Sequence, residues 1–177
     1  DQVGGAQMNW VQARLNEAVA ARTAGTIKWI VTMVHKNWFS ITNFSPDAFD
    51  TRYAYQTMFN NAQVDFMFSG HTHTYQLWKP ITTRASQSDE TDQGTQTVGT
   101  LSGSNWNFAL NHGVMHIING NGGHEINSFG NNPMPSTLLY GNDDEFGYTV
   151  LDIDGNTATV TAKSVGGNVR YSVTCIR

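Results

Sequence analysis

The sequence predicts a layered α/β fold whose C-terminal end is rich in strands. Two amphipathic segments in the first 62 residues are each followed by a short apolar run, and alternating apolar and polar residues fill most of the chain after residue 146. The order helix, strand, helix, strand and then several strands is typical of a layered α/β domain. At 177 residues the chain is long enough for one domain with a hydrophobic core.

Apolar side chains that recur every three or four residues predict two helices. The first covers residues 6–22, and its apolar stripe consists of Met8, Val11, Leu15 and Val19. The second covers residues 47–62, and its stripe consists of Phe49, Tyr53, Met58 and Phe59. Residues 36–46 are polar and aromatic and contain Pro46, which predicts a loop.

Short apolar runs predict buried strands, and strict alternation predicts half-buried ones. The buried strands are residues 27–34, 64–68 and 114–118. A hairpin of residues 147–153 and 157–164 turns at Asp154-Gly155-Asn156, and residues 169–176 form a last strand. Residues 82–104 are predicted to be a long surface loop, and the glycine-rich residues 119–123 a turn.

Composition limits the partners that the chain is expected to have. Ten basic and fourteen acidic residues give a net charge of −4, whereas nucleic acids and anionic membranes favour a basic face. No apolar run approaches the roughly 18 residues of a membrane-spanning helix. Cys175 is the single cysteine and cannot form a disulfide within the chain. A homo-oligomer is left open.

The N-terminus and one sequon bear on localisation. The chain opens with Asp1 and shows no signal peptide, so we expect either processing or a longer natural chain. Asn43-Phe44-Ser45 is an N-glycosylation sequon. We therefore expect a secreted protein, or one in another compartment of the secretory pathway, with glycosylation at Asn43.

Histidines follow two of the predicted buried strands. Gly70-His71-Thr72-His73 comes directly after residues 64–68, and His35 comes directly after residues 27–34. Functional loops of open α/β sheets gather at such strand ends. Histidines two residues apart on an extended segment point to opposite sides, so His71 and His73 would each serve a different one of two neighbouring ions.

A structural role is the alternative for each of these histidines. A lone histidine, or a His-x-His pair by itself, more often has a structural role than a metal-binding one. The placement after an apolar strand and a glycine, with a second strand-end histidine upstream, favours the metal-binding interpretation for His35, His71 and His73. Of the other histidines, His116 is expected to pack inside a strand, and His124 to lie in a solvated loop rather than contact a substrate.

Several segments carry a resemblance to a known family. Residues 64–75 are similar to the closing Gly-His-x-His motif of the metallophosphoesterases, and the Tyr75 that follows it resembles the purple acid phosphatase version. Residues 29–39 resemble the preceding block of that family, a strand ending in histidine and then an aromatic loop. Further segments resemble the family in the right order, and these are residues 7–11, 114–123 and 146–148.

The resemblance implies a fold and a metal centre. Residues 1–177 would be the C-terminal portion of a single metallophosphoesterase domain, a four-layer α/β/β/α sandwich whose N-terminal half is absent from this chain. His35 and His71 would bind one metal ion and His73 the other, and the binuclear centre would contain Fe, Zn or Mn. The pair of ions would clamp a phosphate ester and supply the hydroxide that attacks phosphorus.

Parts of the family pattern are missing from this sequence. An Asp block, a Gly-Asp-x-x-Tyr block and a Gly-Asn-His block lie upstream of the matched region in the family, and none is present here. Without the bridging carboxylate, three histidines should bind a metal pair poorly, so this chain alone is expected to be inactive. No residue is assigned as catalytic, and Lys36, Asn37 and Tyr75 are candidate substrate contacts.

Two functional hypotheses follow from the sequence. The first is hydrolysis of phosphate esters by an acid phosphatase-like enzyme, with a missing N-terminal segment or a second chain as the partner that completes the site. The second is a catalytically inactive, phosphatase-like extracellular protein with a structural or binding role. Bound metal and turnover of a phosphate ester in the protein as isolated separate the two.

Overall fold

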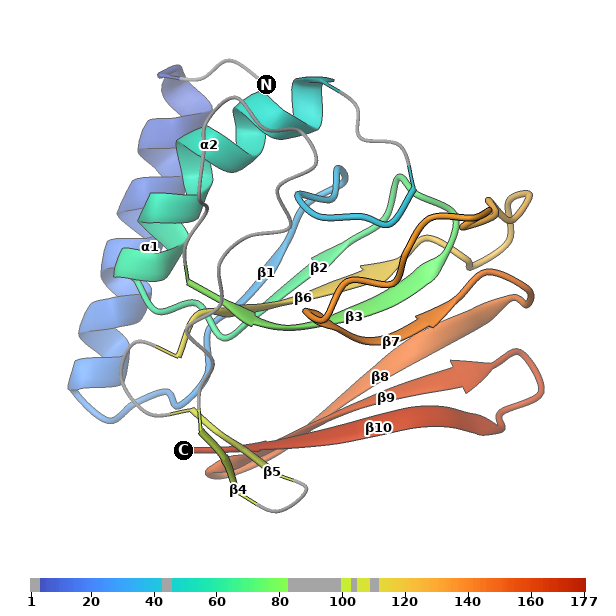
Figure 1. Ribbon diagram of the computed structural model, residues 1–177. Helices are drawn as coiled ribbons and strands as arrows, with labels where there is room; N and C mark the ends of the chain where they lie inside the picture. The colour runs from blue at the N-terminus through green and yellow to red at the C-terminus, as the bar shows by residue number, and fades with distance from the viewer. Residues whose placement is uncertain (1–3, 43–45, 83–99, 103–104, 109–111) are drawn as a thin grey trace.

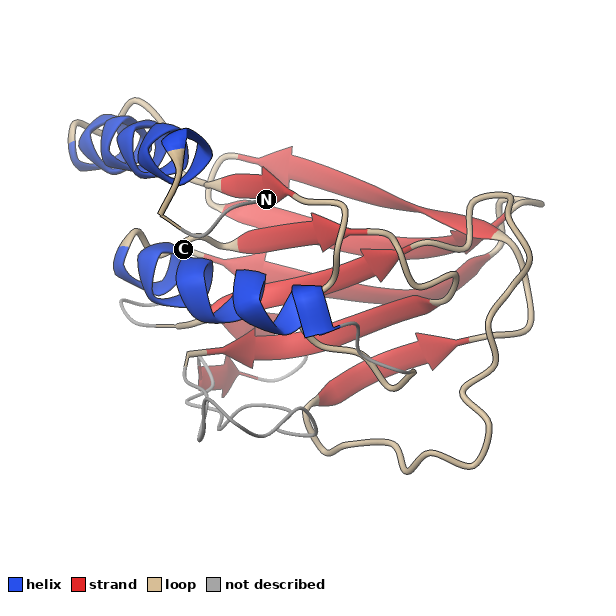
Figure 2. Ribbon diagram, turned by 90° about the horizontal axis from the view of Figure 1, so that it is seen from above, coloured by secondary structure: helices blue, strands red, loops and turns tan. Residues whose placement is uncertain are grey.

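Two helices lie over one face of a five-stranded sheet, and a second five-stranded sheet lies against its other face (Figures 1 and 2). The computed structural model describes residues 4–42, 46–82, 100–102, 105–108 and 112–177. The predicted layered α/β class and the strand-rich C-terminal end are confirmed. The described residues form three layers, and the outer helical layer of a four-layer sandwich stays a prediction.

The elements occupy the following residues in chain order. They are α1 (Ala6–Thr23), β1 (Val31–Met33), α2 (Pro46–Asn61), β2 (Phe66–Ser69), β3 (Tyr75–Ile81), β4 (Thr100–Ser102), β5 (Asn105–Asn107), β6 (Val114–Asn119), β7 (Leu138–Asn142), β8 (Gly147–Asp154), β9 (Thr157–Ser164) and β10 (Val169–Ile176).

The strand order brings three parallel strands side by side in the first sheet. This sheet has the order β1-β2-β6-β3-β7, and β1, β2 and β6 run parallel to one another. The antiparallel strand β3 pairs with both β6 and β7. The second sheet has the order β4-β5-β10-β9-β8 and is antiparallel except between β5 and β10. The loops that follow β1, β2 and β6 therefore emerge at one edge of the first sheet.

Two hydrophobic cores hold these layers together. The core between the helices and the first sheet contains Trp38, Phe59 and Trp78, and the core between the two sheets contains Phe66 and Val160. Adjacent residues of β2 point into different cores, as the period of two in a strand requires. In β9 every second side chain is buried, so the predicted alternation of this strand is confirmed.

A buried ionic cluster joins the start of β2 to the end of the chain. The Asp65 carboxylate is completely buried, accepts a hydrogen bond from the Ile30 backbone N–H at 2.7 Å and forms an ion pair with Arg177. Arg22 lies 3.8 Å from the same carboxylate, and His112 Nε2 lies 3.2 Å from it. Two guanidinium groups on one buried carboxylate offset the cost of removing its charge from water.

The predicted helices and strands differ from the structure in a few places. The strand predicted over residues 27–34 is wrong at its start, because the Ile30 N–H is bound to the Asp65 side chain and only Val31–Met33 pair with β2. The predicted helix stripes are wrong at Val19 and Tyr53, which are exposed. The side chain of Phe49 and most of the predicted loop 82–104 lie outside the described part of the chain, and the loop prediction is wrong at residues 100–102, which form β4.

The Cys175 thiol is free and buried between the sheets, and burial raises its pKa, so it stays protonated. Within the described ranges, neither α1 nor α2 is long and apolar enough to cross a lipid bilayer.

Candidate metal centre

His35 and His71 meet at the edge of the first sheet where the parallel strands end. Each lies two residues beyond its strand, β1 for His35 and β2 for His71. The Val34 N–H donates to the Phe68 carbonyl at 3.0 Å, and the Gly70 N–H donates to the His35 carbonyl at 3.0 Å. These bonds continue the β1–β2 pairing past the strand ends and place the two imidazole centroids 5.3 Å apart, edge to face.

The separation of the His35 and His71 rings fits a shared metal ion. Two imidazoles on one tetrahedral ion, each with a metal–nitrogen bond of about 2.0–2.1 Å, have ring centres about 5 Å apart. Both histidines are exposed, so an ion can reach them from solvent. The donor set also suits the metals that the sequence predicted, because imidazole is a common ligand of Zn and Fe.

His71 adopts a strained backbone conformation that turns the chain sharply. Its φ is +60°, in the left-handed region that residues other than glycine seldom adopt. The next residue, Thr72, is buried, and its hydroxyl donates to Asn37 Oδ1 at 2.8 Å. Strain of this kind costs free energy and persists where the surroundings fix it, often at functional sites. Here Thr72 anchors the turn, and His71 and His73 lie on either side of it.

The surroundings of His71 favour its neutral form. Partial desolvation lowers the pKa of the His71 imidazole, and electrostatic repulsion from the neighbouring His35, Lys36 and His73 lowers it further. A neutral imidazole keeps the nitrogen lone pair that binds a metal ion. His71 is therefore prepared to act as a ligand at neutral pH.

His73 lies against a fourth histidine, which the sequence did not identify as part of the site. The centroids of the His73 and His124 rings are 4.2 Å apart, and the planes are tilted by 45°. This separation is shorter than two ligands of one ion require, so the two rings are packed against each other at a tilt. His124 follows β6, the parallel neighbour of β2, and the only sequence signal for it was its position after the glycine turn.

The four histidines at this sheet edge thus form two pairs, His35 with His71 and His73 with His124. Within the described ranges, no three side chains of His, Cys, Asp or Glu come together as one metal-holding group. The arrangement fits part of a metal centre: it has imidazole ligands, and the residues that the structure describes place no carboxylate with them to bridge two ions. The three predicted ligands are gathered at one edge of the sheet, and their binding of metal stays a prediction.

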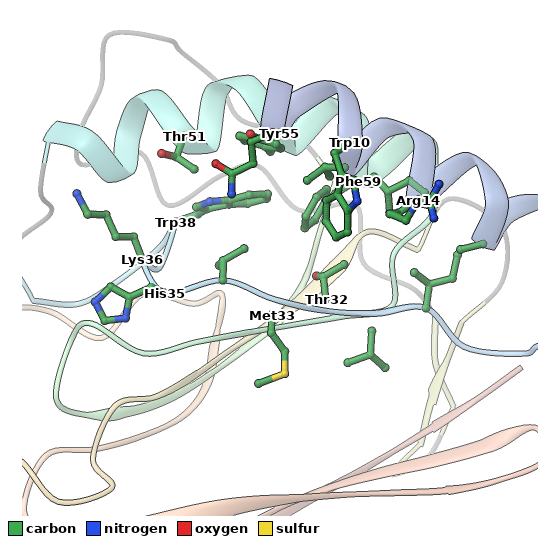
Figure 3. Close-up of a pocket in the computed structure, with 17 residues that line it drawn as sticks. Trp10, Arg14, Thr32, Met33, His35, Lys36, Trp38, Thr51, Tyr55 and Phe59 are labelled. Carbon is green, nitrogen blue, oxygen red and sulfur yellow. The ribbon is translucent and has the colours of Figure 1, made fainter. Parts of the chain in front are cut away.

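The candidate substrate contacts lie in different environments. Lys36 is next to His35 at the end of β1 (Figure 3). Asn37 is buried. Its side-chain oxygen accepts a hydrogen bond from the Thr72 hydroxyl, and its side-chain N–H donates to the Phe39 carbonyl at 3.0 Å. Tyr75 is also buried, and burial raises the pKa of its phenol. A substrate role for these residues stays a prediction, and Asn43 lies outside the described residues.

A cavity adjoins the His35 end of the site. Its volume is about 670 Å³, and it lies between α1, α2 and β1, reaching His35 and Lys36 (Figure 3). In the described part of the chain, β1 is an edge strand of its sheet, and the side chains of Val31 and Met33 are 40% and 84% exposed. Met33 points away from the helices (Figure 3). The sheet is therefore open, with apolar side chains exposed, at the strand that carries His35.

Comparison with protein families and with curated sequences gives partial matches. The family described as iron/zinc purple acid phosphatase-like protein C matches residues 113–170. Purple acid phosphatase 21 of Arabidopsis thaliana is 36% identical over 77 residues, which are 42% of this chain and 16% of that protein. The chain thus spans about a sixth of the length of this relative.

Two solved structures share the fold. The purple acid phosphatase PPD1 from yellow lupin (Lupinus luteus) seeds superposes with a TM-score of 0.66 at 19% identity, over 98% of this chain and 28% of that one. GAP50, the anchor in the inner membrane complex of Plasmodium, superposes with a TM-score of 0.59 at 17% identity, over 93% of this chain and 40% of that one. At these identities the likeness concerns the fold alone.

Proposed function

Because this chain contains a purple acid phosphatase-like C-terminal region, we propose that it supplies the histidine-bearing half of a binuclear metal centre that hydrolyses phosphate esters. The observation that carries the proposal is the pair of imidazoles at the ends of β1 and β2, 5.3 Å apart. His35 and His71 hold one ion, and His73 contributes to the other. The ions are Fe, Zn or Mn.

The chemistry divides between the ions and the side chains of this chain. When bound, a metal pair neutralises charge on the phosphoryl oxygens and lowers the pKa of a bound water. The residues of this chain hold and orient that pair. The buried Thr72 fixes the turn between His71 and His73, and the lowered pKa of His71 keeps its ring neutral for binding. Lys36 is placed beside His35, where its positive charge would attract a phosphate ester.

The carboxylate ligands come from a segment outside residues 1–177 or from another chain. Support comes from the relatives, which extend far beyond the region matched here. It also comes from β1, because an outermost strand with exposed Val31 and Met33 is able to pair with a further strand. A further strand parallel to β1 would end at the same edge of the sheet as His35. A second copy of the chain is the alternative occupant, which would make a homo-oligomer.

The test is metal content and phosphatase activity of the natural protein as isolated, together with the variant His71→Ala. We expect bound metal, turnover of p-nitrophenyl phosphate that a chelator abolishes, and at least a 100-fold lower kcat/KM in the variant. The matched control is Asn131→Ala, an exposed change outside the histidine cluster. Absence of metal and of turnover would refute the enzymatic proposal.

A second candidate function is a catalytically inactive, phosphatase-like extracellular protein with a structural or binding role. The specific observation in its favour is the fold likeness to GAP50, which is an anchor in the inner membrane complex of Plasmodium. The absence of a carboxylate beside the histidines, among the residues described, also fits this candidate. This second candidate function predicts a stable, metal-free protein whose metal content and activity are unchanged by His71→Ala.

Localisation in the secretory pathway is part of the proposal and rests on the sequon at Asn43. We expect a glycan at this residue in the natural protein. Endoglycosidase treatment followed by mass spectrometry tests this, and an unmodified Asn43-containing peptide would contradict it.

A further inference from the structure

We propose that residues 120–127, the loop after β6, act as a clasp that fixes the His73 ring with a proton on Nδ1 and leaves Nε2 as its metal-binding atom. The inference rests on the proposed function, because it concerns how His73 is presented to a metal ion. The clasp is a segment that positions His73, and its side chains that contact His73 are those of Asn127 and His124.

The first support is the contact that sets the tautomer. His73 Nδ1 lies 2.9 Å from the backbone carbonyl oxygen of Glu125. A carbonyl oxygen only accepts hydrogen bonds, so the proton of the neutral ring must be on Nδ1. The lone pair is then on Nε2. A ligand histidine whose other ring nitrogen donates to a carbonyl is oriented and made more basic by that bond.

The second support is that the clasp also holds the backbone of His73. The His73 N–H donates to Asn127 Oδ1 at 2.8 Å, and the Asn127 N–H donates back to the His73 carbonyl at 3.0 Å. The ring of His124 packs against the ring of His73, tilted by 45°. One residue of the loop thus fixes the main chain of His73, a second fixes Nδ1 and a third packs against the ring.

The third support is the close approach of the clasp to the histidine turn. The Gly120 N–H donates to the Thr74 carbonyl at 3.1 Å, and a Cβ on Gly120 would lie 1.9 Å from the Thr72 carbonyl oxygen. The buried Asn121, the next residue, holds the loop to β8. Its side-chain N–H donates to the Glu145 carbonyl, and its backbone carbonyl accepts from the Gly147 N–H, both at 3.1 Å. The clasp is therefore anchored independently of His73.

The experiment measures the His73 tautomer directly, without metal. Long-range ¹H–¹⁵N correlation spectra of the 177-residue chain, at mildly alkaline pH where imidazoles are neutral, distinguish the two tautomers. A neutral histidine in water favours the Nε2–H form, so Nδ1–H at His73 is a clear departure. We expect Nδ1–H at His73, and a shift toward Nε2–H in Asn127→Ala. His73 in the Nε2–H form in the wild-type chain would overturn the clasp.

Zn²⁺ titration of the same proteins gives the second readout. We expect Asn127→Ala to weaken Zn²⁺ binding by about 10-fold, as the loss of a partner that orients a ligand does. Asn131→Ala, an exposed asparagine after the clasp, should leave both the tautomer and the affinity unchanged. An unchanged tautomer in Asn127→Ala would also overturn the clasp.

Two measures keep the test independent of folding and of the proposed function. His124→Ala removes an exposed side chain, so it keeps the fold, and it should increase the mobility of the His73 ring and raise the Nε2–H population. If the natural protein binds no metal, the proposed function fails. The tautomer measurement still decides the clasp, because it needs no metal.

Discussion

Gly120→Ala is the substitution whose effect can be worked out most directly from the structure. The new Cβ would lie 1.9 Å from the Thr72 carbonyl oxygen, and 2.7 Å from the Thr72 carbonyl carbon. Such contacts do not occur below 3.0 Å, so the loop after β6 and the histidine turn must separate by about 1.1 Å or more. Both neighbours are backbone atoms, which cannot swing aside as the end of a side chain does.

The magnitude follows from overpacking and from the loss of one hydrogen bond. Inserting a methyl group into a packed site costs about 1–3 kcal/mol. Losing the bond between the Gly120 N–H and the Thr74 carbonyl costs about 1 kcal/mol. We therefore expect the free energy of unfolding to fall by about 2–4 kcal/mol, which lowers Tm by roughly 4–16 °C in a chain of this length.

Urea unfolding followed by tryptophan fluorescence measures the change, and Gly122→Ala is the matched control. A Cβ on Gly122 meets nothing within 4 Å, so its unfolding free energy should stay within about 0.5 kcal/mol of wild type. The displacement of the loop also releases His73, and Zn²⁺ binding should weaken in Gly120→Ala alone. Equal stability of the two variants would refute the close approach of the loop to Thr72.

Two further predictions concern buried groups. Asp65→Asn should lower the unfolding free energy by about 3–5 kcal/mol, because it leaves Arg22 and Arg177 facing a neutral group. Asp152→Asn, an exposed change, is the control for urea unfolding, and equal effects would contradict the buried cluster. Burial among Trp38, Phe39 and nearby groups lowers the pKa of His116 to about 3, and the positive charge of Arg52 adds to this shift. Below about pH 6.5 the unfolded chain therefore binds a proton at His116, whereas the folded chain does not. The free energy of unfolding falls as the pH drops toward 3. Between about pH 7 and pH 5 the loss is about 2 kcal/mol, and His116→Leu should remove it. Equal pH dependence of His116→Leu and wild type would contradict this account.

Local patterns predicted the elements whose signals are local. The helix periodicity identified α1 and α2, and the Asp154-Gly155-Asn156 turn identified the β8–β9 hairpin. The strand β3 was missed because nearly all its side chains are buried, so nothing alternates, and because it contains Pro80. The strand β7 was missed because it contains Gly141 and depends on its pairing with β3. Neither strand has a signal that is independent of its neighbours.

The same difference between local signals and long-range contacts applies to the candidate site. His35 and His71 were expected at one sheet edge because both follow buried strands, and parallel pairing of β1 with β2 places them there. His124 lies in an exposed loop, as expected. Its contact with His73 was not predicted, because that contact spans 51 positions of sequence and depends on the position of β6 beside β2. The burial of Asn37 and Tyr75 depends on tertiary packing that the motifs do not encode.

The most direct test of the metal centre is a crystal structure of the natural protein grown with Zn²⁺, with anomalous scattering recorded at the zinc edge. We predict one anomalous peak about 2.0–2.1 Å from a ring nitrogen of both His35 and His71, and a second peak at the same distance from Nε2 of His73. Rings of His35, His71 and His73 that turn away from one another, with no anomalous peak within bonding distance of any of them, would contradict the account.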